Sequence, residues 1–300
     1  GLLVPAVIIF MKENMNTKVR GRKDLENLSI PFIGEIPQYL SAKKKLGFDK
    51  HTQSVMKAIV VKEGNRNIIN EAFRVLRSNI DFMAGKDSGQ NVFMLTSFNP
   101  GSGKSFLAMN IAMSFAIKKK RILVIDGDLR HGSTSSYVDS PKTGLSDYLG
   151  NRVSDWKEII VKDEKYDNLH IIPIGTVPPN PTELLEDGKL ATLIEVLRSE
   201  YDYIFIDCPP IDIVADAQII EKLADRTVFV VRSGLLDRSM LPELENIYQE
   251  KRFKNLSVIL NGTESAGGRY GYRYGYRNGY SSYYGNKGKM GGVNGWSSSD

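Results

Sequence analysis

The segment PGSGKS, residues 100–105, combines residue types that bind phosphate groups. It follows an apolar run, FMLTS, and precedes a stretch with helical character, which is the strand–loop–helix context of a phosphate-binding loop. Gly101 and Gly103 allow backbone amides to turn toward phosphate oxygens, and the helix that starts near Lys104 directs its N-terminus at them. Phe98 stands where the strict motif has glycine, but the GKS core is intact.

This loop predicts a site for ATP and Mg²⁺. Lys104 is expected to reach the β- and γ-phosphates, and the Ser105 hydroxyl to coordinate the metal. Asn261, at the end of the apolar run VILN, is a candidate contact for adenine, although an Asn-Gly pair is also an ordinary turn. The predicted nucleotide-binding residues are Pro100, Gly101, Ser102, Gly103, Lys104, Ser105, Phe106 and Asn261.

Three aspartates follow apolar runs that read as buried strands. Asp126 and Asp128 come directly after ILVI, and Asp207 comes after IFI. In a parallel sheet the carboxyl ends of the strands meet at one edge, which is where ligands bind. Acids at that edge, beside a phosphate-binding loop, suit Mg²⁺ either directly or through metal-bound water. The predicted metal site comprises Ser105, Asp126, Asp128 and Asp207.

A cluster of tyrosines near the C-terminus supplies possible phosphate acceptors. Its seven members are Tyr270, Tyr272, Tyr274, Tyr276, Tyr280, Tyr283 and Tyr284. The surrounding Gly/Tyr/Arg/Ser sequence has no aliphatic residues to build a core, so this tail is expected to be disordered. Its charged residues are Arg269, Arg273, Arg277, Lys287, Lys289 and Asp300, which together give a net charge of +4. A nucleotide site and mobile phenol hydroxyls together indicate phosphoryl transfer to tyrosine.

Alternating strands and helices must position these groups. Residues 66–84 have helical periodicity, and near-continuous apolar runs alternate with helices from residue 92 to residue 260. The expected strands cover residues 92–96, 121–126, 170–174, 203–207, 227–231 and 257–260, and the expected helices cover 104–119, 182–199 and 240–251. This pattern predicts an α/β fold of the P-loop NTPase type, with a mostly parallel sheet flanked by helices.

The whole-chain charge of +5 is concentrated in the tail, so it is poor support for a nucleic-acid partner. The lone Cys208 suits a reducing compartment. Residues 1–11 are apolar and precede a basic stretch, which favours the end of a truncated transmembrane helix at its cytoplasmic exit over a short buried strand. The expected organisation is a membrane-helix end at 1–11, a basic connector at 12–50 with one short strand (IPFIGEIP), a catalytic domain at 51–265 and the tail at 266–300.

Taken together, the chain resembles the cytoplasmic module of bacterial tyrosine kinases (BY-kinases), the kinases of exopolysaccharide and capsular polysaccharide chain-length regulators. Beside the phosphate-binding loop, Asp126, Asp128 and Arg130 match the family's apolar-D-x-D-x-R motif. Glu71, Arg74 and Arg77 match its E-x-x-R-x-x-R motif, and the run PPNPTELL and the Tyr-rich tail also resemble the family.

The resemblance implies a protein-tyrosine autokinase with ATP and Mg²⁺ as cofactors. Lys104, Asp126 and Asp128 are then the catalytic residues, with either aspartate as the base that accepts the tyrosine proton. It also implies a homo-oligomeric ring held by Glu71, Arg74 and Arg77, in which each tail enters the neighbouring site. Other implied partners are a tyrosine phosphatase and the polysaccharide export machinery, at the cytoplasmic face of the inner membrane.

Two other readings of the chain stay open at this point. A ParA/MinD-like ATPase shares the expected fold, but it carries lysine where this chain has Asn99. In that reading the Arg/Tyr/Gly tail would bind nucleic acid or form adhesive contacts. Glu71 and Arg74 would then be a local ion pair on an exposed helix face, worth a few tenths of a kcal/mol.

Overall fold

The computed structural model describes residues 17–39, 58–85, 89–211 and 215–264. Eight strands in this part of the chain form one sheet in the order β1-β8-β7-β2-β6-β3-β5-β4. Their bounds are β1 Phe32–Pro37, β2 Val92–Thr96, β3 Ile122–Asp126, β4 Val161–Lys162, β5 Leu169–Ile172, β6 Tyr203–Asp207, β7 Arg226–Arg232 and β8 Ser257–Thr263. Every pairing is parallel except β4 with β5, which confirms the predicted mostly parallel sheet.

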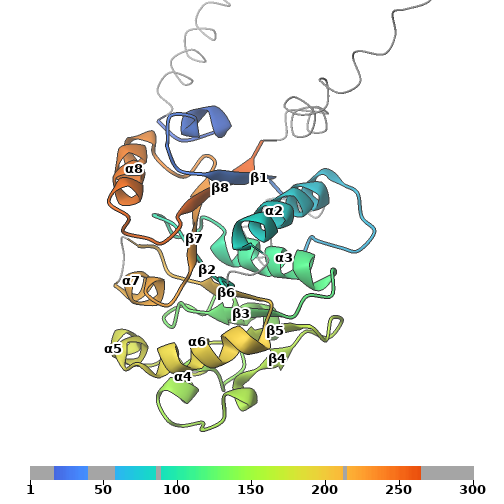
Figure 1. The fold of residues 1–300 in the computed structure, drawn as a ribbon, viewed down its shortest axis with the longest axis vertical. Helices are drawn as coiled ribbons and strands as arrows, with labels where there is room; N and C mark the ends of the chain where they lie inside the picture. Colours follow the sequence, from blue (N-terminus) through green and yellow to red (C-terminus); the bar gives the residue numbers. More distant parts are fainter. Residues whose placement is uncertain (1–16, 40–57, 86–88, 212–214, 265–300) are drawn as a thin grey trace, which may run out of the picture. The chain divides into compact units, whose positions relative to one another are not determined.

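Helices cover both faces of this sheet (Figure 1). The α-helices are α2 Ile68–Ala84, α3 Lys104–Ala116, α4 Leu145–Leu149, α5 Pro181–Glu186, α6 Lys189–Glu200, α7 Asp216–Glu221 and α8 Leu241–Gln249. Short 3-10 turns are η1 Arg22–Leu25, η4 Ser135–Val138, η5 Trp156–Ile159 and η6 Arg238–Met240. Helices α2 and α3 pack together on one face, and α6, α7 and α8 contribute to a core on the other. The central strands are therefore buried on both sides, which explains their continuous apolar sequences.

Helix α2 follows its predicted amphipathic pattern. Phe73, Leu76 and Ile80 are fully buried, and Asn67 caps the helix by accepting a hydrogen bond from the Asn70 amide. On the same face of the sheet, the Phe115 ring of α3 lies 5.9 Å from the Phe205 ring of β6. These contacts fix α3, and with it the loop at its N-terminus, against the middle of the sheet.

The segment predicted as a single helix at residues 182–199 is two helices. The chain breaks between α5 and α6, where Gly188 has a φ of +81°, a left-handed backbone conformation that glycine adopts most readily. The apolar periodicity continues across the break because both helices bury residues such as Leu185 and Leu193. Periodicity alone therefore did not reveal the turn.

The strand predicted in the connector is β1, which pairs with β8 at one edge of the sheet. Upstream of it, Val19 is fully buried and its amide donates a hydrogen bond to the Leu236 carbonyl. This part of the predicted connector thus packs with the domain, while the boundary at residue 51 stays a prediction.

The predicted membrane-helix end and the whole tyrosine cluster lie outside the described residues. Among the helices that are described, none is both long and apolar enough to cross a bilayer.

Candidate active site

The loop of residues 97–103 joins β2 to α3 at the carboxyl end of the sheet, as predicted. Gly103 precedes the first residue of α3 with a φ of +91°, and its carbonyl accepts the helical hydrogen bond from the Leu107 amide at 2.9 Å. A Cβ at this position would lie 2.3 Å from Asn261 Nδ2, so only glycine fits. The first turn of α3 therefore opens toward the loop with its amides unobstructed.

Asn261 holds this loop in place through a hydrogen bond to its backbone. It lies in β8 with 6% of its surface exposed, and its Nδ2 donates a hydrogen bond to the Ser102 carbonyl at 2.8 Å. A second, exposed hydrogen bond to the loop comes from Arg232, whose Nη1 donates to the Gly101 carbonyl at 2.7 Å. Sequence reasoning missed Arg232, which stands at the end of an ordinary apolar strand. The adenine contact proposed for Asn261 stays a prediction.

The two polar residues of the GKS core point to different partners. Lys104 Nζ lies 3.5 Å from Ser97 Oγ, a long contact that leaves most of its donor capacity for phosphate. The Ser105 hydroxyl donates a short hydrogen bond to Asp207 Oδ2. Phe106 instead packs inward, with its ring 6.0 Å from that of Phe73, so any nucleotide contact it makes comes from its backbone.

Asp126 and Asp207 are neighbours across β3 and β6. The two residues are paired in register at the strand ends, and both are almost completely buried. Asp126 Oδ2 accepts hydrogen bonds from the amide and hydroxyl of Ser135 at 2.6 and 2.7 Å. Asp207 Oδ2 accepts one from Thr134 Oγ1 at 2.8 Å. Thr134 and Ser135 were missed by the sequence reasoning, and their only signal was a run of hydroxyl residues just after the aspartates.

Without a bound cation, the ionised forms of Asp126 and Asp207 are unfavourable. Burial raises the pKa of Asp126, and the adjacent Asp207 carboxylate raises it further. Burial also raises the pKa of Asp207, although the Lys104 ammonium and the hydrogen bonds from Ser105 and Thr134 act in the opposite direction. Two buried like charges side by side are a feature of sites that bind a cation or do chemistry.

The donor set fits Mg²⁺ shared with a phosphate. The Oδ1 atoms of both Asp126 and Asp207 are buried without a hydrogen-bond partner. Within the described ranges, no three His, Cys, Asp or Glu side chains converge closely enough to hold a metal by themselves. Mg²⁺ in nucleotide sites normally takes only one or two carboxylates and fills its shell with waters and phosphate oxygens. The Ser105 hydroxyl and the two orphaned carboxylate oxygens match that requirement.

Asp128 occupies a more open position than Asp126. Its side chain is 12% exposed, and its Oδ1 accepts hydrogen bonds from the amides of Arg130 and His131 at 3.3 and 3.2 Å. The largely exposed His131 ring lies 3.2 Å from the same oxygen. Of the two motif aspartates, Asp128 is therefore the one that an incoming hydroxyl group reaches more easily.

Arg130 ties the site to two helices. Its Nε forms an ion pair at 3.0 Å with Asp216, which is fully buried at the start of α7. Its Nη2 donates a hydrogen bond to the Thr182 hydroxyl of α5 at 3.0 Å. That hydroxyl in turn donates to Asp216 Oδ1 at 2.7 Å. Asp216 was not predicted, because no motif marks it. The motif arginine and the PPNPTELL run are thus in contact.

The predicted oligomerisation residues lie on α2, away from the loop. Arg74 forms a salt bridge with Glu71, and its Nη2 donates to the Asn65 carbonyl at 2.7 Å. Arg77 reaches across to α3 and donates to the Ser114 carbonyl at 2.8 Å. All three residues thus have partners within their own chain, and the side chains of Glu71 and Arg74 remain partly exposed.

Comparisons with known proteins place this chain among its relatives. Residues 90–233 match the family model described as an AAA domain. The chain is 34% identical to the tyrosine-protein kinase YwqD of Bacillus subtilis over 210 residues, which cover 69% of this chain and 87% of that protein. A longer relative from Klebsiella pneumoniae, named as a tyrosine-protein kinase in the cps region, is 32% identical. The match covers 90% of this chain but only 38% of the relative.

Solved structures of kinase domains match over most of the chain. The BceF tyrosine kinase domain is 31% identical with a TM-score of 0.69, covering 82% of this chain and 99% of that one. The kinase domain of the Escherichia coli tyrosine kinase ETK gives the same TM-score at 26% identity, with coverage of 87% and 100%. With its loop, its aspartate pair and these matches, the chain belongs to the family of bacterial tyrosine-protein kinases.

Proposed function

We propose that this domain transfers the γ-phosphoryl group of ATP to tyrosine hydroxyls. Its main acceptors are the seven tyrosines between Tyr270 and Tyr284 in the tail of another copy of the same protein. The observation that carries the proposal is the convergence of the loop, Ser105, Asp126 and Asp207 at one edge of the sheet. Family membership supports the choice of tyrosine as acceptor, and the tail supplies seven of them.

The residues divide the chemistry between them. Lys104 and the α3 N-terminus bind the phosphates and offset the charge that develops during transfer. Ser105, Asp126 and Asp207 would hold Mg²⁺, which when bound neutralises charge on the phosphate oxygens. The acceptor phenol has a pKa near 10 and enters protonated, so a carboxylate must take its proton as the new bond forms. We assign that step to Asp128, since Asp126 is fully buried and already accepts two hydrogen bonds from Ser135.

The setting follows from the family. We propose that the chain acts at the cytoplasmic face of the inner membrane and that phosphorylation regulates polysaccharide polymerisation or export. A relative is named for the cps region, which supports a role near capsule synthesis. A tyrosine phosphatase would reset the tail.

Phosphorylation is proposed to occur between subunits of a ring. The test mixes two full-length chains: Lys104→Met, which keeps its tail, and an active chain whose seven tail tyrosines are phenylalanine. After incubation with Mg-ATP, we expect phosphotyrosine on the tail of the Lys104→Met chain, mapped by mass spectrometry. Its complete absence, with an active wild type in parallel, would rule out transfer between chains.

Helix α2 is the proposed subunit contact. Besides Glu71 and Arg74, it exposes Val75 and Phe82, and Phe82 is 88% exposed, which is unusual for a phenylalanine that contacts only water. We expect Arg74→Glu with Arg77→Glu to give a monomer in multi-angle light scattering.

Because Arg77 also bonds to Ser114, Arg74→Glu alone should weaken the ring without disturbing the contact between α2 and α3. The matched control reverses Lys118 and Lys222, two exposed lysines on other elements, and should leave the assembly intact. A ring that persists in both Arg74 variants would overturn this assignment.

A further inference from the structure

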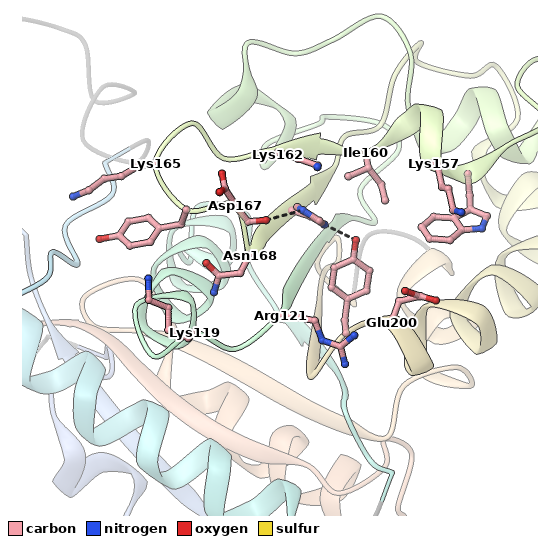
Figure 2. A pocket seen from close by; sticks show the side chains of 13 residues that line it. Lys119, Arg121, Lys157, Ile160, Lys162, Lys165, Asp167, Asn168 and Glu200 are labelled. Carbon is pink, nitrogen blue, oxygen red and sulfur yellow. Dashed lines mark hydrogen bonds between the residues drawn. The ribbon is translucent and has the colours of Figure 1, made fainter.

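A cavity of about 740 Å³, whose lining side chains are drawn in Figure 2, lies at the opposite end of the sheet from the nucleotide loop. Arg121 and Asn168, which line it, stand just before the first residues of β3 and β5. Asp126 closes β3 five residues later, so at about 3.3 Å per residue the two ends are roughly 16 Å apart. The cavity therefore does not belong to the site described above.

The lining of this cavity is strongly cationic. Its charged side chains are Lys119, Arg121, Lys157, Lys162 and Lys165 against Asp167 and Glu200, five positive and two negative charges. In the view of Figure 2, Lys119 and Lys165 lie on one side of the hollow and Lys157 on the other. Arg121 pairs with Asp202 at 3.5 Å, but none of the four lysines forms a salt bridge with any residue that the structure describes. Exposed lysines gathered around one hollow favour a multiply charged anion.

Aromatic side chains form part of the same lining. Lys165 Nζ lies 5.1 Å from the centre of the Tyr166 ring, and Lys157 Nζ lies 5.7 Å from that of Trp156. Tyr166 is 7% exposed, and its hydroxyl has no hydrogen-bond partner. The partly exposed Trp156 ring thus offers aromatic surface beside the Lys157 ammonium, which suits a ligand that joins a flat apolar ring to a charged group.

The wall between these groups is held by hydrogen bonds. Tyr201 Oη lies 2.7 Å from His170 Nδ1, and His170 Nε2 lies 3.0 Å from the Asp167 carbonyl (Figure 2). A neutral ring satisfies both contacts, by accepting from Tyr201 and donating to Asp167. Burial lowers the pKa of His170, which agrees with the neutral form. The wall is preorganised, and the positive charge at the cavity comes from its lysines and Arg121.

We propose that this cavity binds phosphotyrosine in the tail of the same chain. The inference rests on the proposed function, because it takes the product of that reaction as its ligand. Phosphotyrosine combines the aromatic ring and the dianion that the cavity favours. The stretch from Glu264 to Tyr284 is twenty residues, or up to about 70 Å when extended, which is long enough to reach the far end of the sheet.

The charges of the tail and the cavity favour binding only after phosphorylation. The unmodified tail carries a net +4 and is repelled by the lysines. Each phosphate adds about −1.5 to −2, so three phosphotyrosines or more make the tail negative and attract it. Phosphorylation would thereby move the tail away from the acidic metal site and hold it at the opposite end of the domain, where it no longer competes as a substrate.

The test measures binding of a synthetic peptide, residues 268–284, with phosphotyrosine at Tyr272, Tyr274 and Tyr276. The protein is the full chain carrying Lys104→Met, so that its own tail stays unphosphorylated. Fluorescence anisotropy should detect binding of the phosphopeptide that weakens with salt, and much weaker binding of the unmodified peptide. Adding Lys157→Gln, Lys162→Gln and Lys165→Gln should weaken phosphopeptide binding at least about tenfold.

The matched control neutralises Lys62, Lys142 and Lys222, which are exposed and do not line the cavity, and should bind the phosphopeptide normally. Equal binding to the two triple variants would overturn the proposal. So would an acidic polysaccharide that binds the cavity when the phosphopeptide does not. In an otherwise wild-type chain the cavity triple should still phosphorylate its tail. Because the peptide is synthetic, a failure of binding is separable from a failure of kinase activity.

Discussion

Replacing Lys104 with methionine should reduce tail phosphorylation to background, a loss of at least about 10²–10³-fold in rate. Methionine keeps the length and the apolar stem of the side chain but removes the ammonium that offsets charge on the transferring phosphoryl group. In the protein alone this ammonium makes only a long hydrogen-bond contact to Ser97, but its charge also lowers the pKa of the buried Asp207 carboxyl, so its loss should cost some stability. The measurement is phosphotyrosine mapping by mass spectrometry after incubation with Mg-ATP.

The control for this change is Lys118→Met, at an exposed lysine just beyond α3. It should retain full activity. Lys118→Met should unfold within about 2 °C of the wild type, and Lys104→Met should still unfold in one cooperative transition, which separates lost chemistry from lost folding. Tail phosphate in purified Lys104→Met protein, at the level of the wild type, would contradict the role given to this residue.

Asp126→Asn should abolish most activity while making the metal-free protein more stable. Burial and the neighbouring Asp207 both disfavour the charge on Asp126, as its raised pKa shows. Asparagine removes that charge, and its side-chain oxygen can still accept the hydrogen bonds from Ser135. We expect a gain of about 1–2 kcal/mol in the free energy of unfolding at neutral pH in the presence of a chelator, measured by urea denaturation.

The same substitution removes a ligand from the proposed Mg²⁺ site. Added Mg-ATP should therefore stabilise the wild type more than the variant, and the phosphorylation rate should fall by about 10²-fold or more. Asp187→Asn, an exposed change at the C-terminal end of α5, is the matched control and should alter neither quantity. If Asp126→Asn were clearly less stable than the wild type without metal, the two carboxylates would not be the unfavourable pair inferred from the structure.

Most of the sheet could be predicted because its strands are buried on both faces and are apolar throughout. The expected ranges at 92–96 and 203–207 coincide with β2 and β6. The two-residue strand β4 was missed because Val161 and Lys162 carry too little pattern to stand out. It is held in place by antiparallel pairing with β5, which is a tertiary effect.

The site was predictable where its residues lie next to a strand end. Ser105, Asp126 and Asp207 meet as expected because parallel strands bring their carboxyl ends together. The supporting residues could not be predicted, because Arg232 and Asp216 act through contacts between elements far apart in the chain. Phe106 differs from these residues: its ring packs inward on Phe73, so the nucleotide contact predicted for it stays a prediction and would come from its backbone.

The most direct test of the proposed function is the position of phosphate on the wild-type chain. Purified full-length protein, first treated with a tyrosine phosphatase, is incubated with Mg-ATP and its peptides are mapped by tandem mass spectrometry. The account predicts phosphotyrosine concentrated at Tyr270–Tyr284. An unmodified tail in a protein that hydrolyses ATP would contradict it and favour an ATPase whose tail is not a substrate.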